Sequence, residues 1–219
     1  MNRILGLCGL LCALVLTGCA KPVPYDYTAF KESKPRSILV LPPVNHSPDV
    51  KASYSMLSQV TYPLAESGYY VLPVAVVEET FRQNGLTTAQ DIQAVNVSKL
   101  HQIFGADAAL YLDVKEYGTK YIVINSETRV TADARLVDLR NGKLLWSGSA
   151  TASSDEQQSS NSGGIIGILV QAAIDQIAST MSDKGHDIAG ITSGRLLAAG
   201  HPRGMLYGPR SLQYGKETY

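Results

Sequence analysis

Cysteine is nearly absent from this chain of 219 residues, which has only Cys8, Cys12 and Cys19. Beyond residue 19 a disulfide framework, a cysteine zinc site and a thiol nucleophile are therefore excluded. Net charge is absent too, because 19 Lys and Arg side chains balance 19 Asp and Glu side chains. A chain this close to neutral has no general attraction for nucleic acid or for an anionic membrane surface.

Recognisable catalytic and metal-binding motifs are also missing. There is no Gly-x-Ser-x-Gly elbow and no phosphate-binding glycine loop ending in Lys-Ser or Lys-Thr. Four acids on predicted strands and turns lack a paired second acid: Asp107, Asp113, Asp133 and Asp138. The four histidines lack metal-ligand spacing: His46, His101, His186 and His201. We therefore expect no catalytic residue, no metal and no cofactor.

Two histidines have specific expected settings. His46 follows the first predicted strand. Ligands favour the carboxyl ends of strands in such sheets, so His46 is the histidine best placed for a role in a site. Hydrogen bonding within the turn 45–48 is its expected use. Asp183, His186 and Asp187 form a polar cluster that we expect to be solvated at a helix end.

The N-terminus has no apolar run long enough to span a bilayer. The run 4–16 has about 13 residues, short of the roughly 20 that a spanning helix needs. Arg3, this apolar run and the small residues after it form a secretion signal. The stretch Leu16-Thr17-Gly18-Cys19 resembles the lipobox of bacterial lipoproteins. The alternative is a plain signal peptide followed by an unrelated cysteine.

The lipobox resemblance implies cleavage before Cys19, diacylation of its thiol and acylation of the new N-terminus, with palmitate as a typical chain. Several acyl chains anchor a protein stably in a membrane. Ala20 stands where lipoproteins of the inner membrane typically carry Asp. The resemblance therefore implies lipid anchoring in the outer membrane, facing the periplasm or the cell surface.

Four segments are expected along the chain: a signal peptide 1–18, a lipidated tether 19–36, an α/β domain 37–187 and a tail 188–219 rich in Gly, Pro and Tyr. Three prolines between residues 21 and 36 predict an extended tether, reaching at most ~50 Å. The tail is expected either to be loosely ordered or to contact a partner through its aromatic and Arg side chains.

The first half of the domain alternates strands and helices. Strands are expected at 37–41 and 69–72, and helices at 50–67, around 76–83, after the Thr88–Asp91 capping box and around 100–104. Pro63 is expected either to kink the first helix or to make it restart near Tyr62. The apolar stripe of that helix is expected to comprise Val50, Tyr54, Leu57, Thr61 and Leu64.

Beyond Gly105 the apolar period changes from 3.6 to 2, which predicts an antiparallel meander at 110–115, 128–136 and 144–152. Asn141-Gly142 marks its hairpin turn. A polar loop 153–162 precedes a predicted helix 163–182, packed on the sheet, against a second protomer, or at a membrane interface. The order βαβα, meander, C-terminal helix predicts an α/β fold with a mixed sheet and helices on one face.

Three segments resemble the curli-secretion lipoprotein CsgG and the amino-terminal domain of TolB. They are the strand and loop 38–47, the Gly-Ala-Asp turn within 104–108 and the hairpin 136–148. Through Gly68–Val71 and Leu206–Arg210 the whole chain is similar to a narrower family of Gram-negative outer-membrane lipoproteins. The resemblance implies a sheet-and-helix domain used for assembly at the outer membrane. It does not imply a pore, because the hairpins are too short.

The resulting hypothesis is a non-enzymatic scaffold or accessory factor in assembly, secretion or transport at the outer membrane. Its expected partners are the membrane, through the lipid anchor, and other envelope proteins, and it is expected to form a homo-oligomer such as a dimer. The alternative is a regulator that activates a peptidoglycan synthase, for which a tether of about 16 residues is short. A hydrolase that uses His46 is a third hypothesis.

Overall fold

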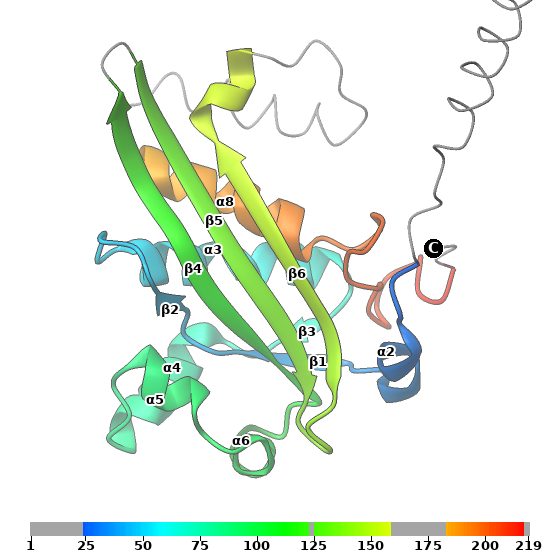
Figure 1. Cartoon of the computed structure of the whole chain (residues 1–219). Helices are drawn as coiled ribbons and strands as arrows, with labels where there is room; N and C mark the ends of the chain where they lie inside the picture. Colours follow the sequence, from blue (N-terminus) through cyan, green and yellow to red (C-terminus); the bar gives the residue numbers. More distant parts are fainter. Residues whose placement is uncertain (1–23, 123–124, 159–182, 217–219) are drawn as a thin grey trace, which may run out of the picture.

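The computed structural model of the chain describes residues 24–122, 125–158 and 183–216 (Figure 1). Its sheet has the strand order β3-β1-β4-β5-β6, and β2 also pairs with β4. The strands are β1 Ser37–Val40, β2 Val44–Asn45, β3 Tyr70–Val71, β4 Ala108–Ile122, β5 Asn125–Asp138 and β6 Leu144–Ser153. The helices are α2 Thr28–Ser33, α3 Ala52–Glu66, α4 Val74–Gln83, α5 Ala89–Gln93, α6 Val97–Phe104 and α8 Lys184–Leu197, with a 3-10 turn η1 at Ser154–Gln158.

The sheet is mixed, as predicted. Strand β1 pairs in parallel with β3 and β4, whereas β4, β5 and β6 form the antiparallel meander. The turn between β5 and β6 contains Gly142 at φ 75°, a left-handed conformation that glycine adopts without strain. The hairpin predicted from Asn141-Gly142 is therefore confirmed, although the strands end at Asp138 and resume at Leu144, which makes the turn longer than two residues.

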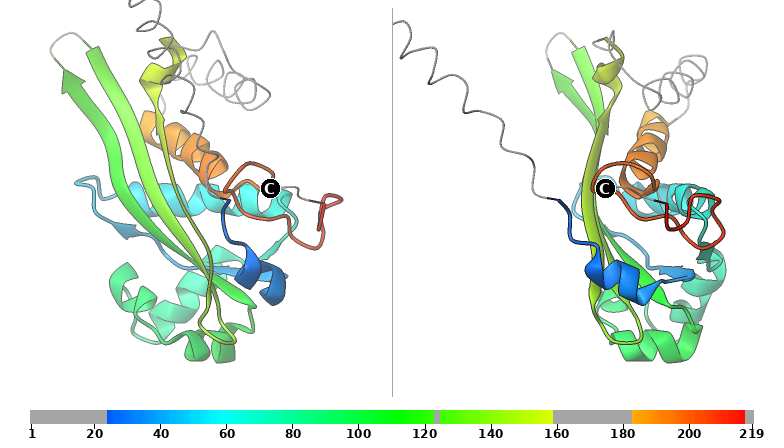
Figure 2. Two further views of the ribbon diagram at one scale, coloured as in Figure 1. Left: turned by 45° about the vertical axis from the view of Figure 1, so that its right-hand side comes forward. Right: turned by 90° about the vertical axis from the view of Figure 1, so that its right-hand side faces the viewer.

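Two hydrophobic cores lie on opposite faces of the sheet. On one face, α3 and α8 pack against β1, β4, β5 and β6, around residues such as Ile38, Leu110 and Trp146. On the other face, α4, α5 and α6 cover only the end of the sheet near β1, around Leu39 and Tyr111. Figure 2 shows α8 and α3 as one layer behind the long strands. The α/β class and the mixed sheet are confirmed, but helices pack on both faces of the sheet and not on one face as predicted.

The apolar stripe predicted for helix α3 is confirmed only in part: Leu57 and Leu64 are buried, but the buried face is centred on other residues. Val50 and Tyr54 are 85% and 65% exposed. The buried stripe instead repeats every four residues, which places these side chains on one helical face: Ala52, Met56, Val60 and Leu64. The helix also continues through Pro63 as one element, so the predicted restart near Tyr62 is wrong.

The segment 24–36, which we call the N-terminal segment, was expected to be extended, and this prediction is wrong. Residues 28–33 form α2, and Tyr27 and Phe30 are buried at 5% and 3% exposure. Burying the apolar surface of these two side chains stabilises the docked segment, whereas an extended tether would leave them in water. The part of the tether that precedes residue 24 lies outside the described residues.

The C-terminal part also differs from the prediction. The predicted helix 163–182 lies outside the described residues, whereas the C-terminal helix of the structure, α8, starts at Lys184. Asp183 and His186 therefore lie at the start of a helix and not at its end. After α8 the chain packs on the domain through Met205 and Leu206, which are 0% and 6% exposed. The tail is ordered on its own domain as far as residue 216.

Candidate functional site at the junction of the N-terminal segment

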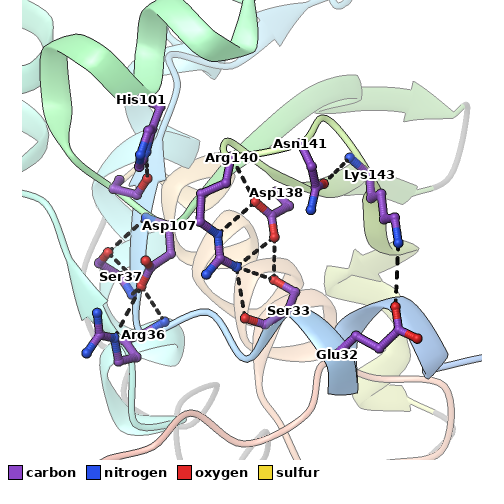
Figure 3. A network of polar contacts seen from close by, with 11 residues as sticks. Glu32, Ser33, Arg36, Ser37, His101, Asp107, Asp138, Arg140, Asn141 and Lys143 are labelled. Atoms are coloured by element: carbon purple, nitrogen blue, oxygen red, sulfur yellow. Dashed lines mark hydrogen bonds and ion pairs between the residues drawn. The ribbon is translucent and has the colours of Figure 1, made fainter.

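The N-terminal segment meets the domain at a polar junction, where the turn before β4 and the turn between β5 and β6 lie side by side (Figure 3). Asp107 belongs to the first turn and Asp138 to the end of β5. The backbone N–H of Leu139 donates to the carbonyl of Asp107 at 2.9 Å and joins the two turns. Both acids belong to the segments that resemble CsgG and TolB.

Asp138 is the buried centre of this junction, with no exposed surface. One oxygen, Oδ1, accepts from the backbone N–H and from Nε of Arg140, at 2.8 and 3.0 Å. The other, Oδ2, accepts from the Arg140 guanidinium at 2.6 Å and from Ser33 Oγ at 2.7 Å. Burial alone would raise the pKa of Asp138, but the hydrogen bonds from Arg140 and Ser33 outweigh it and lower the pKa. The carboxylate stays ionised and holds α2.

Arg140 links the same acid to the N-terminal segment. Its guanidinium donates to the backbone carbonyl and to Oγ of Ser33, both at 2.8 Å, as well as to Asp138. The planar guanidinium suits this arrangement because its N–H groups point in fixed directions toward several acceptors. Lys143 adds a weaker, exposed ion pair with Glu32 at 3.5 Å.

Asp107 fixes the start of β1. Its Oδ2 accepts from the backbone N–H groups of Arg36 and Ser37, at 2.8 and 3.2 Å, while its own N–H donates to Ser37 Oγ at 3.0 Å. These bonds satisfy backbone donors that the short strand leaves without partners. The Gly-Ala-Asp turn therefore has a structural use in this chain.

Tyrosines attach the N-terminal segment to the rest of the domain. The hydroxyl of Tyr25 accepts from the N–H of Ser147 in β6 at 2.8 Å. The buried hydroxyl of Tyr27 donates to the carbonyl of Gly204 in the C-terminal tail. These contacts were not predicted from the sequence, although the spacing of Tyr27 and Phe30 by three residues was a signal for a short helix with one buried face.

The C-terminal tail crosses the chain after α3 at two glycines. The N–H of Gly208 donates to the carbonyl of Ser67 at 2.8 Å, and a Cβ on Gly208 would lie 2.5 Å from the carbonyl oxygen of Gly68. Beside this crossing, the Tyr69 hydroxyl donates to the carbonyl of Leu206 and Arg210 lies over the Tyr70 ring. The two segments that resemble the narrower family, Gly68–Val71 and Leu206–Arg210, therefore contact each other.

The histidines lie apart and each has a local partner. His46 Nε2 lies 3.0 Å from Asp113 Oδ1 on the exposed side of the sheet. The turn 45–48 is held instead by Asn45, whose Oδ1 accepts from the N–H and Oγ of Ser47, so the expected use of His46 within that turn is wrong. His101 Nδ1 donates to the carbonyl of Ala106.

His186 lies in the seam between α3 and α8. Its Nδ1 is 3.0 Å from Ser55 Oγ and its Nε2 is 2.7 Å from Gln59 Nε2. The Tyr117 hydroxyl donates to the same Ser55 oxygen at 2.8 Å. Ser55 is buried, with 9% of its surface exposed. This Ser–His contact therefore joins two helices and does not present a nucleophile to solvent.

A groove of about 340 Å³ opens between α3, α4 and α5. The exposed side chains of Val50 and Tyr54 line it, facing Glu78 and Arg82 of α4. The charge of Glu78 raises the pKa of the Tyr54 hydroxyl above its ordinary value. Val50 and Tyr54 were expected in the core, so this surface was not predicted from the sequence.

Within residues 24–122, 125–158 and 183–216, no three His, Cys, Asp or Glu side chains are grouped so that they could hold a metal ion. No helix in the same ranges combines the length and the apolar character needed to cross a membrane. Cys19, the predicted lipidation site, lies outside them.

Residues 25–210 match the family described as GNA1162-like lipoproteins. The chain belongs to this family. The match begins at Tyr25 and ends at Arg210, so it includes both the N-terminal segment and the glycine crossing of the tail. The chain is therefore a lipoprotein of the Gram-negative envelope, as the family resemblance predicts, whereas lipidation at Cys19 stays a prediction.

A Neisseria meningitidis serogroup B protein named "Putative lipoprotein NMB1124/NMB1162" is 51% identical over 207 residues, covering 94% of this chain and 95% of that protein. The crystal structure of lipoprotein GNA1162 from Neisseria meningitidis has 56% identity and a TM-score of 0.55, covering 67% of this chain and all of the other. A dodecameric PelC from Paraburkholderia phytofirmans has 17% identity and a TM-score of 0.42, covering 74% of this chain and 86% of its own. That likeness is too weak to support an argument about function.

Proposed function

We propose that this GNA1162-like protein is anchored in the outer membrane by acyl chains on Cys19. Its domain acts there as a non-enzymatic scaffold that binds other envelope proteins in assembly, secretion or transport. The observation that carries the proposal is the docked N-terminal segment. It holds the domain close to the predicted lipidation site and leaves the α3–α4–α5 groove open to a partner.

The attachment is short. Because residues 25–36 are fixed on the domain, only the five residue steps from Cys19 to Pro24 separate the predicted lipid from the first described residue. Fully extended, they span at most about 18 Å. A scaffold that binds neighbours in the same membrane needs no more, whereas a regulator that reaches a distant synthase does. The short attachment therefore supports the scaffold over the alternative.

The groove has the composition of a protein-binding surface. Aromatic and Arg side chains are enriched where proteins bind each other, and exposed apolar residues that gather in one place are typical of such sites. Tyr54 and Arg82 line the groove together with Val50, which is 85% exposed. We infer that an envelope protein binds here.

Labelled palmitate tests the anchor in growing cells. The parent and a Cys12→Ser control should take up label equally, because Cys12 lies in the segment that cleavage would remove. Cys19→Ser should take up none. Equal labelling of Cys19→Ser and the parent, or no label in the parent, would refute the anchor.

Site-specific photo-crosslinking in intact cells tests the partner groove. A photoreactive residue at Tyr54 should capture one discrete envelope protein, identified by mass spectrometry, whereas the same residue at the exposed Gln102 of α6 should not. A crosslinked species of twice the chain mass would instead identify a second copy as the partner, as the predicted homo-oligomer requires. Identical capture at both positions would contradict a specific partner site in the groove.

A further inference from the structure

A basic surface lies where α2 and the end of the tail come together. A cavity of about 390 Å³ between them is lined by Phe30, Lys31 and Lys34 on one side and by Tyr214 on the other. Arg210 and Lys216 lie on the same tail and are exposed. We call these four cations, together with Leu212 and Tyr214, the basic rim.

The charges of the basic rim are available to a ligand. Within the described residues, Lys31, Lys34 and Lys216 form no ion pair, and Arg210 stacks on the Tyr70 ring with no carboxylate partner. Nearby cations differ in this respect, since Lys143 pairs with Glu32 and Arg36 pairs with Asp107. The chain as a whole has no net charge, so the positive charge of the rim is a local feature.

Exposed apolar side chains accompany these cations. Leu212 is 86% exposed and Tyr214 is 41% exposed, in a part of the tail without regular secondary structure. Aromatic rings and cations placed beside an exposed Leu are the combination that settles at the boundary between lipid headgroups and acyl chains. In water the apolar surface of Leu212 stays unburied and contributes no hydrophobic stabilisation.

The basic rim also adjoins the N-terminal segment that leads to the lipid. Figures 1 and 2 show α2, which begins four residues after Pro24, beside the described end of the tail. The span from Cys19 to Pro24 is at most about 18 Å, which is shorter than the domain. An anchor this short brings the surface around Pro24, and with it the basic rim, to the bilayer.

We propose that the basic rim rests on the anionic headgroups of the membrane that anchors the chain, with Leu212 and Tyr214 at the acyl boundary. This inference rests on the proposed lipid anchor at Cys19. The contact fixes the orientation of the domain. It turns α5 and the α3–α4–α5 groove away from the lipid, because Figure 1 places α5 on the side opposite α2.

A single labelled cysteine tests the contact in the acylated full-length mature protein. The chain has no cysteine beyond residue 19, so Leu212→Cys gives a unique free thiol for the polarity-sensitive fluorophore NBD. Gln90→Cys on α5 is the matched control. The proteins are reconstituted in vesicles of phosphatidylethanolamine and phosphatidylglycerol at 3:1, and in vesicles of phosphatidylcholine alone.

In the anionic vesicles the label at position 212 should be at least threefold brighter than at position 90 and should be quenched by lipids that carry a nitroxide near the headgroup. The triple variant Lys31→Gln, Lys34→Gln and Lys216→Gln, or phosphatidylcholine vesicles, should reduce this difference at least twofold, because screening and charge removal weaken the attraction. Equal brightness and equal quenching of the label at positions 212 and 90, in protein that floats with the vesicles, would overturn the inference. So would a signal at position 212 that is independent of lipid charge.

Flotation of the vesicles separates this failure from failure of the anchor. Protein that does not float with either vesicle type would refute the lipid anchor itself, on which both proposals depend. Protein that floats while its label at position 212 reports water leaves the anchor intact and removes only the basic rim from the membrane.

Discussion

Two polar clusters lie on strands β4 and β5 and differ mainly in burial. At one end of the sheet, Asp138 is fully buried and accepts hydrogen bonds from Arg140 and Ser33. On the exposed side, Asp113 meets His46 at 3.0 Å and Lys115 at 3.8 Å. A buried carboxylate depends on its partners because water cannot replace them, whereas an exposed one is already solvated. The buried carboxylate of Asp138 therefore holds the N-terminal segment, whereas the exposed carboxylate of Asp113 contributes little to stability.

The exposed cluster has a second feature that the buried one lacks. Asp113 and Asp133 stand directly opposite each other in the β4–β5 register, a placement that is unfavourable for like charges. The register shifts between Val114 and Glu116, and Lys115 at this bulge lies 3.8 Å from both carboxylates. The bulge thus places a cation between the two acids.

The largest expected effect is that of Asp138→Asn. The change keeps the size of the side chain but removes the anion that Arg140 and Ser33 contact. Because the Arg140 side chain is 39% exposed and can be solvated, we expect a loss of about 2 kcal/mol, typical of hydrogen bonds to a charged group. Urea unfolding, followed by the fluorescence of Trp146, measures the loss; Trp146 is the chain's single tryptophan and is 1% exposed. A loss under about 0.5 kcal/mol, the range of ordinary surface substitutions, would contradict the difference between the two clusters.

The pH dependence of the same pair of proteins follows from the lowered pKa of Asp138. A carboxyl with a folded pKa below its unfolded value, about 3.9, stabilises the fold above that pH and loses this effect as the pH falls through the folded pKa. The stability difference between the parent and Asp138→Asn should be complete at pH 7 and shrink below about pH 4. Urea midpoints measured from pH 3 to pH 7 check this, and a difference that is constant over the range would contradict it.

Ser33→Ala should have an intermediate effect. It removes one donor to Asp138 and one acceptor of Arg140 but leaves the ion pair intact, so a loss of about 1 kcal/mol is expected. The loss should be local, with hydrogen exchange increasing in α2 more than in β5. Uniformly faster exchange across the sheet would show that Ser33 does not act by holding the N-terminal segment.

Much of the fold was predictable because its signals are local in the chain. The period-two strands, the capping box at Thr88 and the Asn141-Gly142 turn are written within a few residues of the structure that they form. The junction was not predictable in this way. Ser33 and Arg140 are separated by 107 residues, and neither has a local pattern that indicates the other.

The phase of α3 shows why the groove was missed. Tyr54 and Val50 are apolar enough to predict burial, while the buried face includes the small residues Ala52 and Ser55. Hydrophobicity alone selected the larger side chains. An exposed apolar side chain in a binding groove cannot be told from a buried one by periodicity, so the candidate partner surface required the structure.

The smallest expected effect is that of Asp113→Asn, which completes the comparison with Asp138. The exposed carboxylate loses its contacts with His46 and Lys115, but the change also removes the repulsion with Asp133 across the ladder. These opposing terms, each of a few tenths of a kcal/mol, should leave the free energy of unfolding within about 0.5 kcal/mol of the parent. The same urea titration measures it. A loss as large as that of Asp138→Asn would mean that the His46 cluster holds the domain together, and burial would then not explain the difference between the two acids.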